Sequence, residues 1–251
     1  MSGELYFVTG TDTDAGKTVA TAWLGWALQR AGRRVALVKP FQTGATDPAR
    51  EGDEAVYQAA LGDAATLRTL STLPEPLAPS IAARRAGVTL SVEEALRTCR
   101  TIGEAHDVTF VEGAGGLLVT ITDETDMADL AASMPAPLVL VVRPALGTLN
   151  HTLLSVEAAE RRGLDVALIV VSGYASSAAL APAVVEAENL RFLQERLPAI
   201  PMLVLGRQEP TAADFPRAMP AWRLGAASPL LAPLGLEALH LEDEIARARW
   251  P

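Results

Sequence analysis

The chain has 251 residues, of which 49% are hydrophobic and 20% are charged, and its formal net charge is −9 at pH 7. This acidic balance excludes a general binder of nucleic acid or of anionic membranes, because both classes need a basic surface. Its apolar runs are far shorter than the roughly 20 residues of a membrane-spanning helix. Cys99 is the only cysteine and no basic start precedes an apolar stretch, so we expect a cytoplasmic protein.

Short apolar runs rich in β-branched residues predict five buried strands. In chain order these strands cover residues 5–9, 34–38, 108–111, 138–142 and 166–171, and helices are predicted over residues 17–31, 92–104, 149–162 and 183–197. Strands that are apolar on both faces and alternate with helices are typical of a parallel sheet between helical layers. We therefore expect one α/β domain over residues 1–251, with a mostly parallel sheet flanked by helices.

Two regions show less regular patterns. Residues 43–90 hold four prolines among short helical pieces, and residues 206–233 are rich in proline and alanine. Irregular segments of this length usually carry function. A last acidic helix is predicted over residues 236–249.

The first predicted strand runs into the sequence GTDTDAGKT, residues 10–18, which then opens a helix. A strand, a tight turn and a helix in this order are the setting of a phosphate-binding loop, or P-loop. Backbone N–H groups at the helix N-terminus favour an anion, and Lys17 adds a full positive charge. The hydroxyl of Thr18 is placed to bind Mg²⁺, which neutralises charge during phosphoryl transfer.

The loop departs from the common pattern in its first glycine. That pattern has glycine five residues before the second one, where this chain has Thr11, and the turn glycine is Gly10 instead. A glycine-containing turn that merely caps a helix is the alternative interpretation. The combination of strand, turn, GKT and helix favours nucleotide binding.

The second predicted strand ends in the sequence KPFQTG, residues 39–44. The carboxyl ends of parallel strands line the ligand crevice of an open α/β sheet, so Lys39 is expected to point where Lys17 points. Two ammonium groups beside one γ-phosphate would stabilise the charge that develops during transfer. If this segment stood alone, the default interpretation of Lys39 would be a solvated lysine that ends a strand.

The third predicted strand ends in VEGAGG, residues 111–116, where Glu112 follows an apolar run. We regard Glu112 as a candidate Mg²⁺ ligand, and the glycines after it allow the backbone to approach a ligand closely. Asp53 is a further candidate oxygen ligand. From the residues alone, Glu51 or Glu54 would serve as well as Asp53.

Taken together, GTDTDAGKT, KPFQTG, Asp53, VEGAGG and the sequence LGTLNH at residues 146–151 resemble the dethiobiotin synthetase family. The likeness covers roughly the first two thirds of the chain. It implies a homodimeric, cytoplasmic enzyme of biotin biosynthesis with the P-loop ATPase topology. The implied reaction converts 7,8-diaminopelargonic acid, CO₂ and ATP into dethiobiotin, ADP and phosphate.

The resemblance also implies roles for individual residues. It makes Lys17 and Lys39 the catalytic lysines, and it makes Thr18, Asp53 and Glu112 the Mg²⁺ ligands. The implied nucleotide-binding residues are Thr13, Asp14, Ala15, Gly16, Lys17, Thr18, Val19, Asp53, Glu112, Gly113, Ala114 and Gly115. The implied substrate-binding residues are Thr43, Gly147, Thr148, Leu149 and Asn150, the last four receiving the substrate carboxylate across a dimer interface.

Two positions differ from the family pattern. Ser172 stands where the family has an asparagine that reads the adenine edge, and Asn189 is the nearest match to a family tyrosine near the substrate carboxylate. Because the implied chemistry needs no covalent nucleophile, Cys99 is interpreted as buried and inert and His106 as an ordinary loop residue. His151 is interpreted as a residue that supports the dimer or the substrate site before it is considered catalytic.

Two other functions fit a P-loop. The first is ATP-dependent amidation of a corrin-ring carboxylate, but such enzymes usually carry a glutaminase domain with a nucleophilic cysteine, for which this chain has little room. The second is a partitioning or membrane-cycling ATPase, whose loop has an additional early lysine where this chain has Thr11 to Thr13. Its membrane form also needs a basic C-terminal helix, whereas the one predicted here is acidic.

Overall fold

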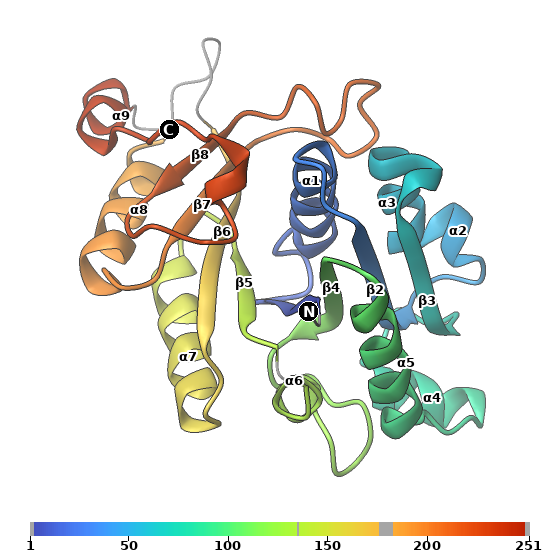
Figure 1. Cartoon of the computed structure of the whole chain (residues 1–251). Helices are drawn as coiled ribbons and strands as arrows, with labels where there is room; N and C mark the ends of the chain where they lie inside the picture. The colour runs from blue at the N-terminus through green and yellow to red at the C-terminus, as the bar shows by residue number, and fades with distance from the viewer. Residues whose placement is uncertain (1–2, 135, 176–182, 249–251) are drawn as a thin grey trace.

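The computed structural model describes residues 3–134, 136–175 and 183–248, and its centre is an eight-stranded sheet (Figure 1). The strand order is β3-β2-β4-β1-β5-β6-β7-β8, and the pairings are parallel except that β8 runs antiparallel to β7. The strands are β1 (Glu4–Gly10), β2 (Val35–Thr43), β3 (Thr66–Leu73), β4 (Val108–Gly116), β5 (Leu138–Val142), β6 (Val166–Tyr174), β7 (Met202–Gly206) and β8 (Ala221–Leu224). The expected mostly parallel sheet is confirmed.

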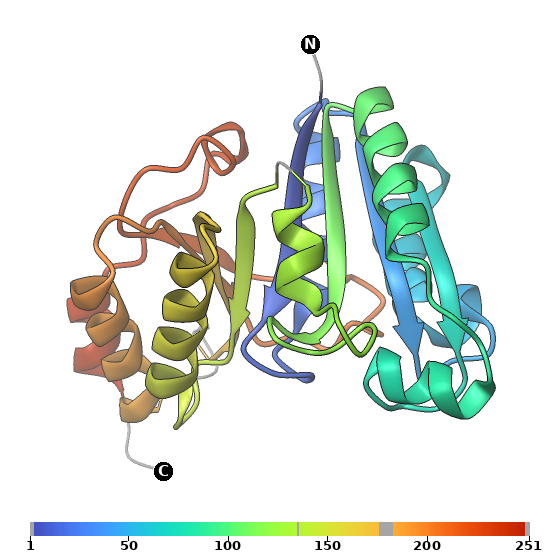
Figure 2. The ribbon, with the colours of Figure 1, turned by 90° about the horizontal axis from the view of Figure 1, so that it is seen from below.

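Helices cover both faces of this sheet (Figures 1 and 2). One face carries α1 (Lys17–Arg30) and α3 (Asp53–Leu61), together with the turn η2 (Ala232–Leu234). The other face carries α4 (Pro79–Ala86), α5 (Val92–Ala105), α6 (Met127–Ala132), α7 (Thr148–Arg161), α8 (Val184–Arg196) and α9 (Leu241–Arg247). Two short elements, α2 (Pro48–Glu51) and η1 (Gly62–Ala64), flank α3.

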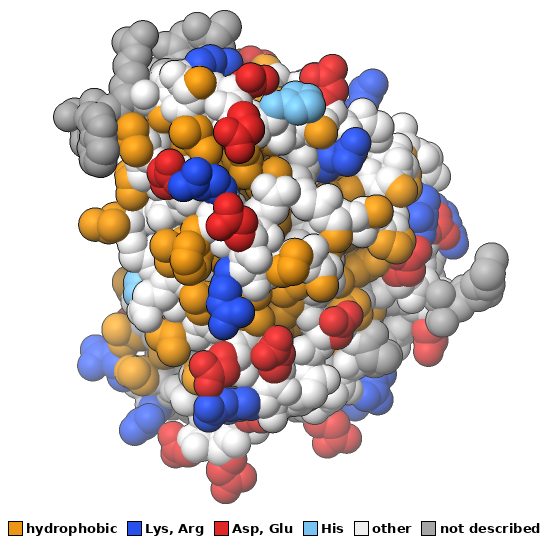
Figure 3. All heavy atoms as spheres, turned by 90° about the vertical axis from the view of Figure 1, so that its left-hand side faces the viewer, with side chains coloured by type: hydrophobic (Ala, Val, Ile, Leu, Met, Phe, Trp, Pro, Cys, Tyr) orange, Lys and Arg blue, Asp and Glu red, His pale blue; other side chains and the backbone are white. Residues whose placement is uncertain are grey.

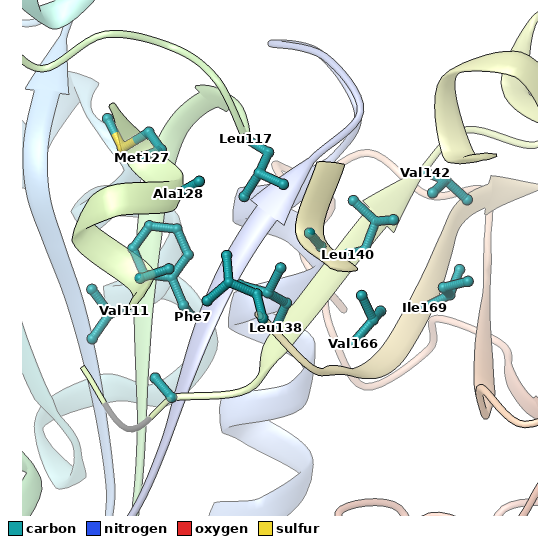
Figure 4. Packing of buried hydrophobic residues seen from close by; sticks show 14 of the residues in the cluster. Phe7, Val111, Leu117, Met127, Ala128, Leu138, Leu140, Val142, Val166 and Ile169 are labelled. Carbon is teal, nitrogen blue, oxygen red and sulfur yellow. The ribbon is translucent and has the colours of Figure 1, made fainter. Parts of the chain in front are cut away.

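The central strands are mostly apolar because both of their faces are buried. Phe7 of β1 packs in the cluster that Figure 4 shows, with Leu138 and Leu140 of β5. Its neighbour Val8 packs in the second cluster, under α1. Successive side chains of a strand point to opposite faces, so a strand between two helical layers needs apolar residues at every position.

Several boundaries differ from the sequence prediction. The strands β3, β7 and β8 were not predicted, and β3 lies inside the region that we expected to be irregular. Most residues of β3 are only half-buried, and its sequence TLRTLSTL has no continuous apolar run that would mark a strand. The last helix begins at Leu241 instead of residue 236, and residue 249 lies outside the described part of the chain.

Two of the predicted strands are longer than expected. The strand β2 continues to Thr43 and β4 continues to Gly116, so Lys39 and Glu112 lie within strands and do not follow them. The glycines after Glu112 form the last part of β4 and are not a turn. Among the described residues, no helix combines the length and apolar character that a membrane crossing requires.

Cys99 provides a test of the packing of α5 against the sheet. Its side chain is fully buried, and burial raises the pKa of its thiol to about 12. Because the thiolate is the reactive form, we expect no reaction of the folded protein with a thiol-directed disulfide reagent at neutral pH. The absorbance of the released chromophore should report one thiol per chain only after denaturant is added. Full reaction of the native protein would contradict the packing described for α5.

Candidate functional site

The phosphate loop between β1 and α1 is closed around the side chain of Lys17. The Lys17 ammonium donates to the backbone oxygens of Asp12 and Thr13 at 2.9 and 3.0 Å. Gly16 caps α1 in the left-handed conformation, with φ of 91°, which favours glycine. A side chain at this position would also collide with Ser172, because an added Cβ would lie 2.4 Å from its Oγ. The sequence therefore folds into the predicted loop, and the loop touches the end of β6.

Four of the predicted residues meet beside this loop, although they come from four elements. The Thr18 hydroxyl of α1 donates to Asp53 Oδ1 of α3 at 2.9 Å and to Glu112 Oε1 of β4 at 3.1 Å. The ammonium of Lys39, in β2, lies 2.6 Å from Asp53 Oδ2 and 2.9 Å from Glu112 Oε1. It also donates to the carbonyl oxygen of Gly113 at 3.0 Å. We refer to Thr18, Lys39, Asp53 and Glu112 as the charged cluster.

The pairing of strands explains why Lys39 and Glu112 meet. The parallel register between β2 and β4 places Val38 opposite Val111. Lys39 and Glu112 each follow one member of this pair, so they lie next to each other on adjacent strands. Their side chains are 5% and 1% exposed, respectively. A buried carboxylate and a buried ammonium are tolerated when they are paired with each other.

Burial and nearby opposite charges shift the pKa values of Lys39 and Asp53 in opposite directions. Burial is the largest influence on Lys39, yet attraction to Glu112 and Asp53 leaves its pKa above the usual value. In the same way burial disfavours a charged Asp53, but Lys39 holds the pKa of that carboxyl below its usual value. Lys17 has no carboxylate hydrogen-bonded to it, and burial lowers its pKa to about 8. The two lysines therefore differ in proton affinity.

Two residues of the site were missed by the sequence prediction. The hydroxyl of Tyr57 donates to Glu112 Oε2 at 2.6 Å, and Gln42 Oε1 accepts from the backbone N–H of Asp53 at 3.0 Å. Residues four apart on a helix share a face, so the position of Tyr57 four residues after Asp53 was a usable signal. Gln42 offered no comparable signal. Tyr57 thus holds the Glu112 oxygen that Lys39 does not contact, and Gln42 holds the backbone of Asp53.

The choice of basic residue sets the two lysines apart from the rest of the sequence. The chain contains 19 arginines and only two lysines, Lys17 and Lys39, and both are 4% exposed. Surface positions tolerate either residue, whereas a compact ammonium in a buried site cannot be replaced by the planar, five-donor guanidinium. Both lysines therefore occupy positions that require an ammonium group.

The oxygen atoms of Thr18, Asp53 and Glu112 suit a hard divalent cation. Two carboxylates and one hydroxyl converge, and Mg²⁺ prefers oxygen ligands, usually one or two carboxylates together with phosphate oxygens. In the described ranges no group of three or more His, Cys, Asp or Glu side chains could hold a metal by itself. The set therefore fits a cation that is shared with a bound phosphate.

The other predicted nucleotide-binding residues lie along the loop and its neighbours. Thr13 and Asp14 are exposed at the tip of the phosphate loop, whereas Ala15 is buried. Val19 lies in the first turn of α1. Gly113, Ala114 and Gly115 are in the last part of β4, and Gly115 has a positive φ of 67°.

The predicted substrate-binding residues fall into two places. Thr43 is the last residue of β2, and Gly147 caps the N-terminus of α7 with φ of 92°. Thr148, Leu149 and Asn150 form the first turn of α7. The hydrogen bonds that this turn makes are local, from Thr148 N–H to Ala145 O and from His151 N–H to Gly147 O. A cleft of about 390 Å³ lies between the phosphate loop, residues 116–119 and the middle of α7.

His106, which we interpreted as an ordinary loop residue, has structural contacts. His106 is hydrogen-bonded to Ile102 O and Thr66 Oγ1 at 2.7 and 2.8 Å, and it caps the end of α5. His151 is exposed on α7. The buried amide of Asn189 donates to backbone oxygens of the loop before α7.

Comparisons with known proteins identify relatives of this chain. A protein-family model described as an AAA domain matches residues 4–210. The ATP-dependent dethiobiotin synthetase of Rhodococcus erythropolis is 46% identical over 172 residues, which are 68% of this chain and 75% of that protein. The enzyme of the same name from Mycobacterium avium is 43% identical over 211 residues, 83% of this chain and 90% of that protein.

The fold also has a counterpart among solved structures. The cell division ATPase MinD of Pyrococcus furiosus superposes with a TM-score of 0.54 and covers 98% of this chain and 99% of its own. The two sequences are only 17% identical, so this likeness concerns the fold alone. The P-loop NTPase topology of the sheet is confirmed.

The different proton affinities of the two lysines can be tested by amine labelling. With nucleotide-free and Mg²⁺-free protein at pH about 8, a limiting amount of an acylating reagent should modify Lys17 before Lys39. The reason is that Lys17 is partly neutral at this pH, whereas the two carboxylates keep Lys39 protonated. Peptide mass spectrometry identifies the labelled residue without interference from other lysines. The unfolded protein should label at both sites equally, and faster labelling of native Lys39 would refute the assignment.

Proposed function

The chain belongs to the ATP-dependent dethiobiotin synthetase family, and from this premise we propose the reaction and the residues that perform it. The enzyme is an ATP-dependent ligase of biotin biosynthesis that converts 7,8-diaminopelargonic acid and CO₂ into dethiobiotin. The observation that carries the assignment to this site is the meeting of Lys39, Asp53 and Glu112 beside a closed phosphate loop. These residues provide the charges that the reaction needs.

The reaction joins two anions before it closes a ring. One amine of the substrate adds to CO₂, loses a proton and becomes a carbamate. A carbamate oxygen attacks the γ-phosphorus of ATP, which releases ADP and leaves a carbamic-phosphoric anhydride. The neighbouring amine attacks the carbonyl carbon of this anhydride, and the five-membered urea forms as phosphate leaves. The ring closes readily because both amines are on adjacent carbons of one bound molecule.

We assign the electrostatic part of this chemistry to the two lysines. Lys17 belongs to the phosphate loop and is the first residue of α1, at the helix N-terminus that favours phosphate. Lys39 is held in place by Asp53, Glu112 and the oxygen of Gly113, so its charge is oriented before substrates arrive. Such preorganised charges stabilise a transition state without reorganisation at the moment of reaction.

Mg²⁺ is part of the proposal, with Thr18, Asp53 and Glu112 as its protein ligands. A bound Mg²⁺ would neutralise part of the charge of the phosphate groups. Tyr57 donates to Glu112 and Gln42 contacts the backbone of Asp53, and these contacts would orient the two carboxylates. Replacement of either carboxylate by an uncharged residue would therefore disturb the geometry as well as the charge.

We also propose that the active enzyme is a homodimer. Leu146 is 87% exposed next to the predicted substrate-binding turn, and Leu154 of α7 is 56% exposed. Figure 3 shows hydrophobic side chains gathered among charged ones on the face that carries α7 and α8. A second protomer that covers α7 would bring the turn Gly147–Asn150 of one chain toward the charged cluster of the other. A single domain per chain and a cytoplasmic location complete the proposal.

The alternative functions have less support. Corrin-ring amidation would require a source of ammonia, and Cys99 is buried and unreactive in α5. A membrane-cycling ATPase is not favoured either, because the first turn of α9 is acidic, with Glu242, Asp243 and Glu244. The likeness to a cell division ATPase is one of fold.

The activity assay decides between these functions. Purified protein with Mg²⁺-ATP and bicarbonate should release phosphate only after 7,8-diaminopelargonic acid is added, because the phosphoryl acceptor is the carbamate of that diamine. Mass spectrometry should detect dethiobiotin in an amount equal to the phosphate released. Phosphate release that does not depend on the diamine would refute the proposal.

Replacement of Lys39 tests its catalytic role. Lys39→Ala should lower turnover by at least about 100-fold, as loss of one preorganised charge does in other enzymes. ATP should still bind, because Lys17 and the phosphate loop are unchanged, and calorimetric titration measures this directly. Arg50→Ala removes an exposed charge that pairs with the exposed Asp47, and it serves as a control with normal turnover. Normal turnover of Lys39→Ala would return Lys39 to a structural role.

A further inference from the structure

The helix α8 carries two polar side chains that are buried to the same degree. Glu186 and Asn189 are each 6% exposed, and they are three residues apart, which places them on one face of the helix. Around them, α8 buries Ala187, Leu190 and Leu193 in the usual manner of a core helix. Burial of a carboxylate or an amide is costly unless hydrogen bonds compensate it. The partners of these two side chains are therefore informative.

Asn189 contacts the loop that leads into α7. Its Nδ2 group donates to Pro144 O at 2.9 Å and to Ala145 O at 3.3 Å. The Ala145 oxygen also accepts from Thr148 N–H, so the amide and the first turn of α7 share this acceptor. The amide group thus holds the loop just before Gly147, the residue that caps α7.

Glu186 contacts the end of β6 and Ala175, the residue after it. Its Oε2 accepts from the backbone N–H of Ala175 at 3.1 Å, and its Oε1 pairs with Arg207 at 2.9 Å. Arg207 binds the same segment a second time, from its Nε to Gly173 O at 3.3 Å. This segment begins with Ser172, which adjoins Gly16 of the phosphate loop. Glu186 therefore determines the position of backbone that borders the nucleotide loop.

The two contacted stretches are neighbours in the fold. The strands β5 and β6 pair in parallel, so the loop after β5 and the end of β6 lie at the same edge of the sheet, where ligands of open α/β sheets bind. One face of α8 thus holds both stretches through backbone contacts. Neither side chain needs to reach a ligand to affect binding.

We propose that Glu186 and Asn189 are positioning residues with separate tasks. Asn189 positions the turn Gly147–Asn150 for the carboxylate of the diamino acid, and Glu186 positions residues 172–175 beside the nucleotide. This inference rests on the proposed function. It adds that one helix sets the affinities for the diamino acid and for ATP independently, through two side chains that are one turn apart.

A kinetic comparison of two variants tests this division. Asn189→Leu keeps the approximate volume but removes the donors, and Glu186→Gln removes the charge. For Asn189→Leu we expect the KM for the diamino acid to rise about ten-fold, as the loss of buried hydrogen bonds allows, with the KM for ATP within about two-fold of wild type. For Glu186→Gln we expect the opposite pattern. In both variants kcat should change less than the affected KM.

Each variant is the control for the other, because both alter a buried polar side chain on the same helix face. Leu193→Val adds a control for stability, since it weakens the packing of α8 without altering a hydrogen bond. It should lower the melting temperature and leave both KM values unchanged. Nucleotide titration of the three variants measures ATP affinity separately from turnover.

The outcomes separate the two levels of the proposal. A wild-type enzyme that forms no dethiobiotin would overturn the proposed function, and the inference with it. An active wild type whose two variants raise both KM values equally, or lose only thermal stability, would leave the function standing and overturn the inference. The crossed pattern of KM changes is the result that supports it.

Discussion

The pairing of one buried ammonium with two carboxylates is the constraint on which the site depends. Lys39 lies between Asp53 and Glu112, and these three side chains come from β2, α3 and β4. None of them can be buried alone, because removing one partner from a buried ion pair costs about 3–5 kcal/mol. The hydroxyls of Thr18 and Tyr57 complete the group from α1 and from α3. The cluster thereby ties the phosphate loop to the sheet and fixes α3 against it.

The order of the strands makes this arrangement possible. The strand β4 lies between β2 and β1, so the phosphate loop after β1, Glu112 in β4 and Lys39 in β2 meet near one edge of the sheet. On the other side of β1, the strands β5 and β6 lead to the loops that α8 holds. The charged chemistry and the contacts of α8 are therefore on opposite sides of the central strand, and the phosphate loop lies between them.

Restriction of lysine to two buried positions has a physical explanation. Arginine supplies the other side-chain cations of the chain, and many of them form exposed ion pairs such as Arg34 with Asp107. A guanidinium suits such forked contacts with solvent-exposed carboxylates. Lys39 instead contacts three oxygen atoms from two carboxylates and a carbonyl, which a compact ammonium with three donors can satisfy.

The sequence by itself determined the central strands, the phosphate loop and the identity of Lys39 and Glu112 as candidates, because apolar runs and glycine-rich turns are local signals. It did not determine that β2 and β4 continue through those residues, because the apolar run of each strand ends at the charged residue. It also did not determine that β3 is a strand, because a half-buried strand lacks an apolar run. Asp53 could not be chosen over Glu51 or Glu54 from the residues alone. The tertiary structure places Asp53 against Lys39, whereas Glu51 turns to Thr46 and Asp47. Tyr57, Gln42, Glu186 and Asn189 were decided only by packing, since each acts through a backbone or side-chain partner that is distant in sequence.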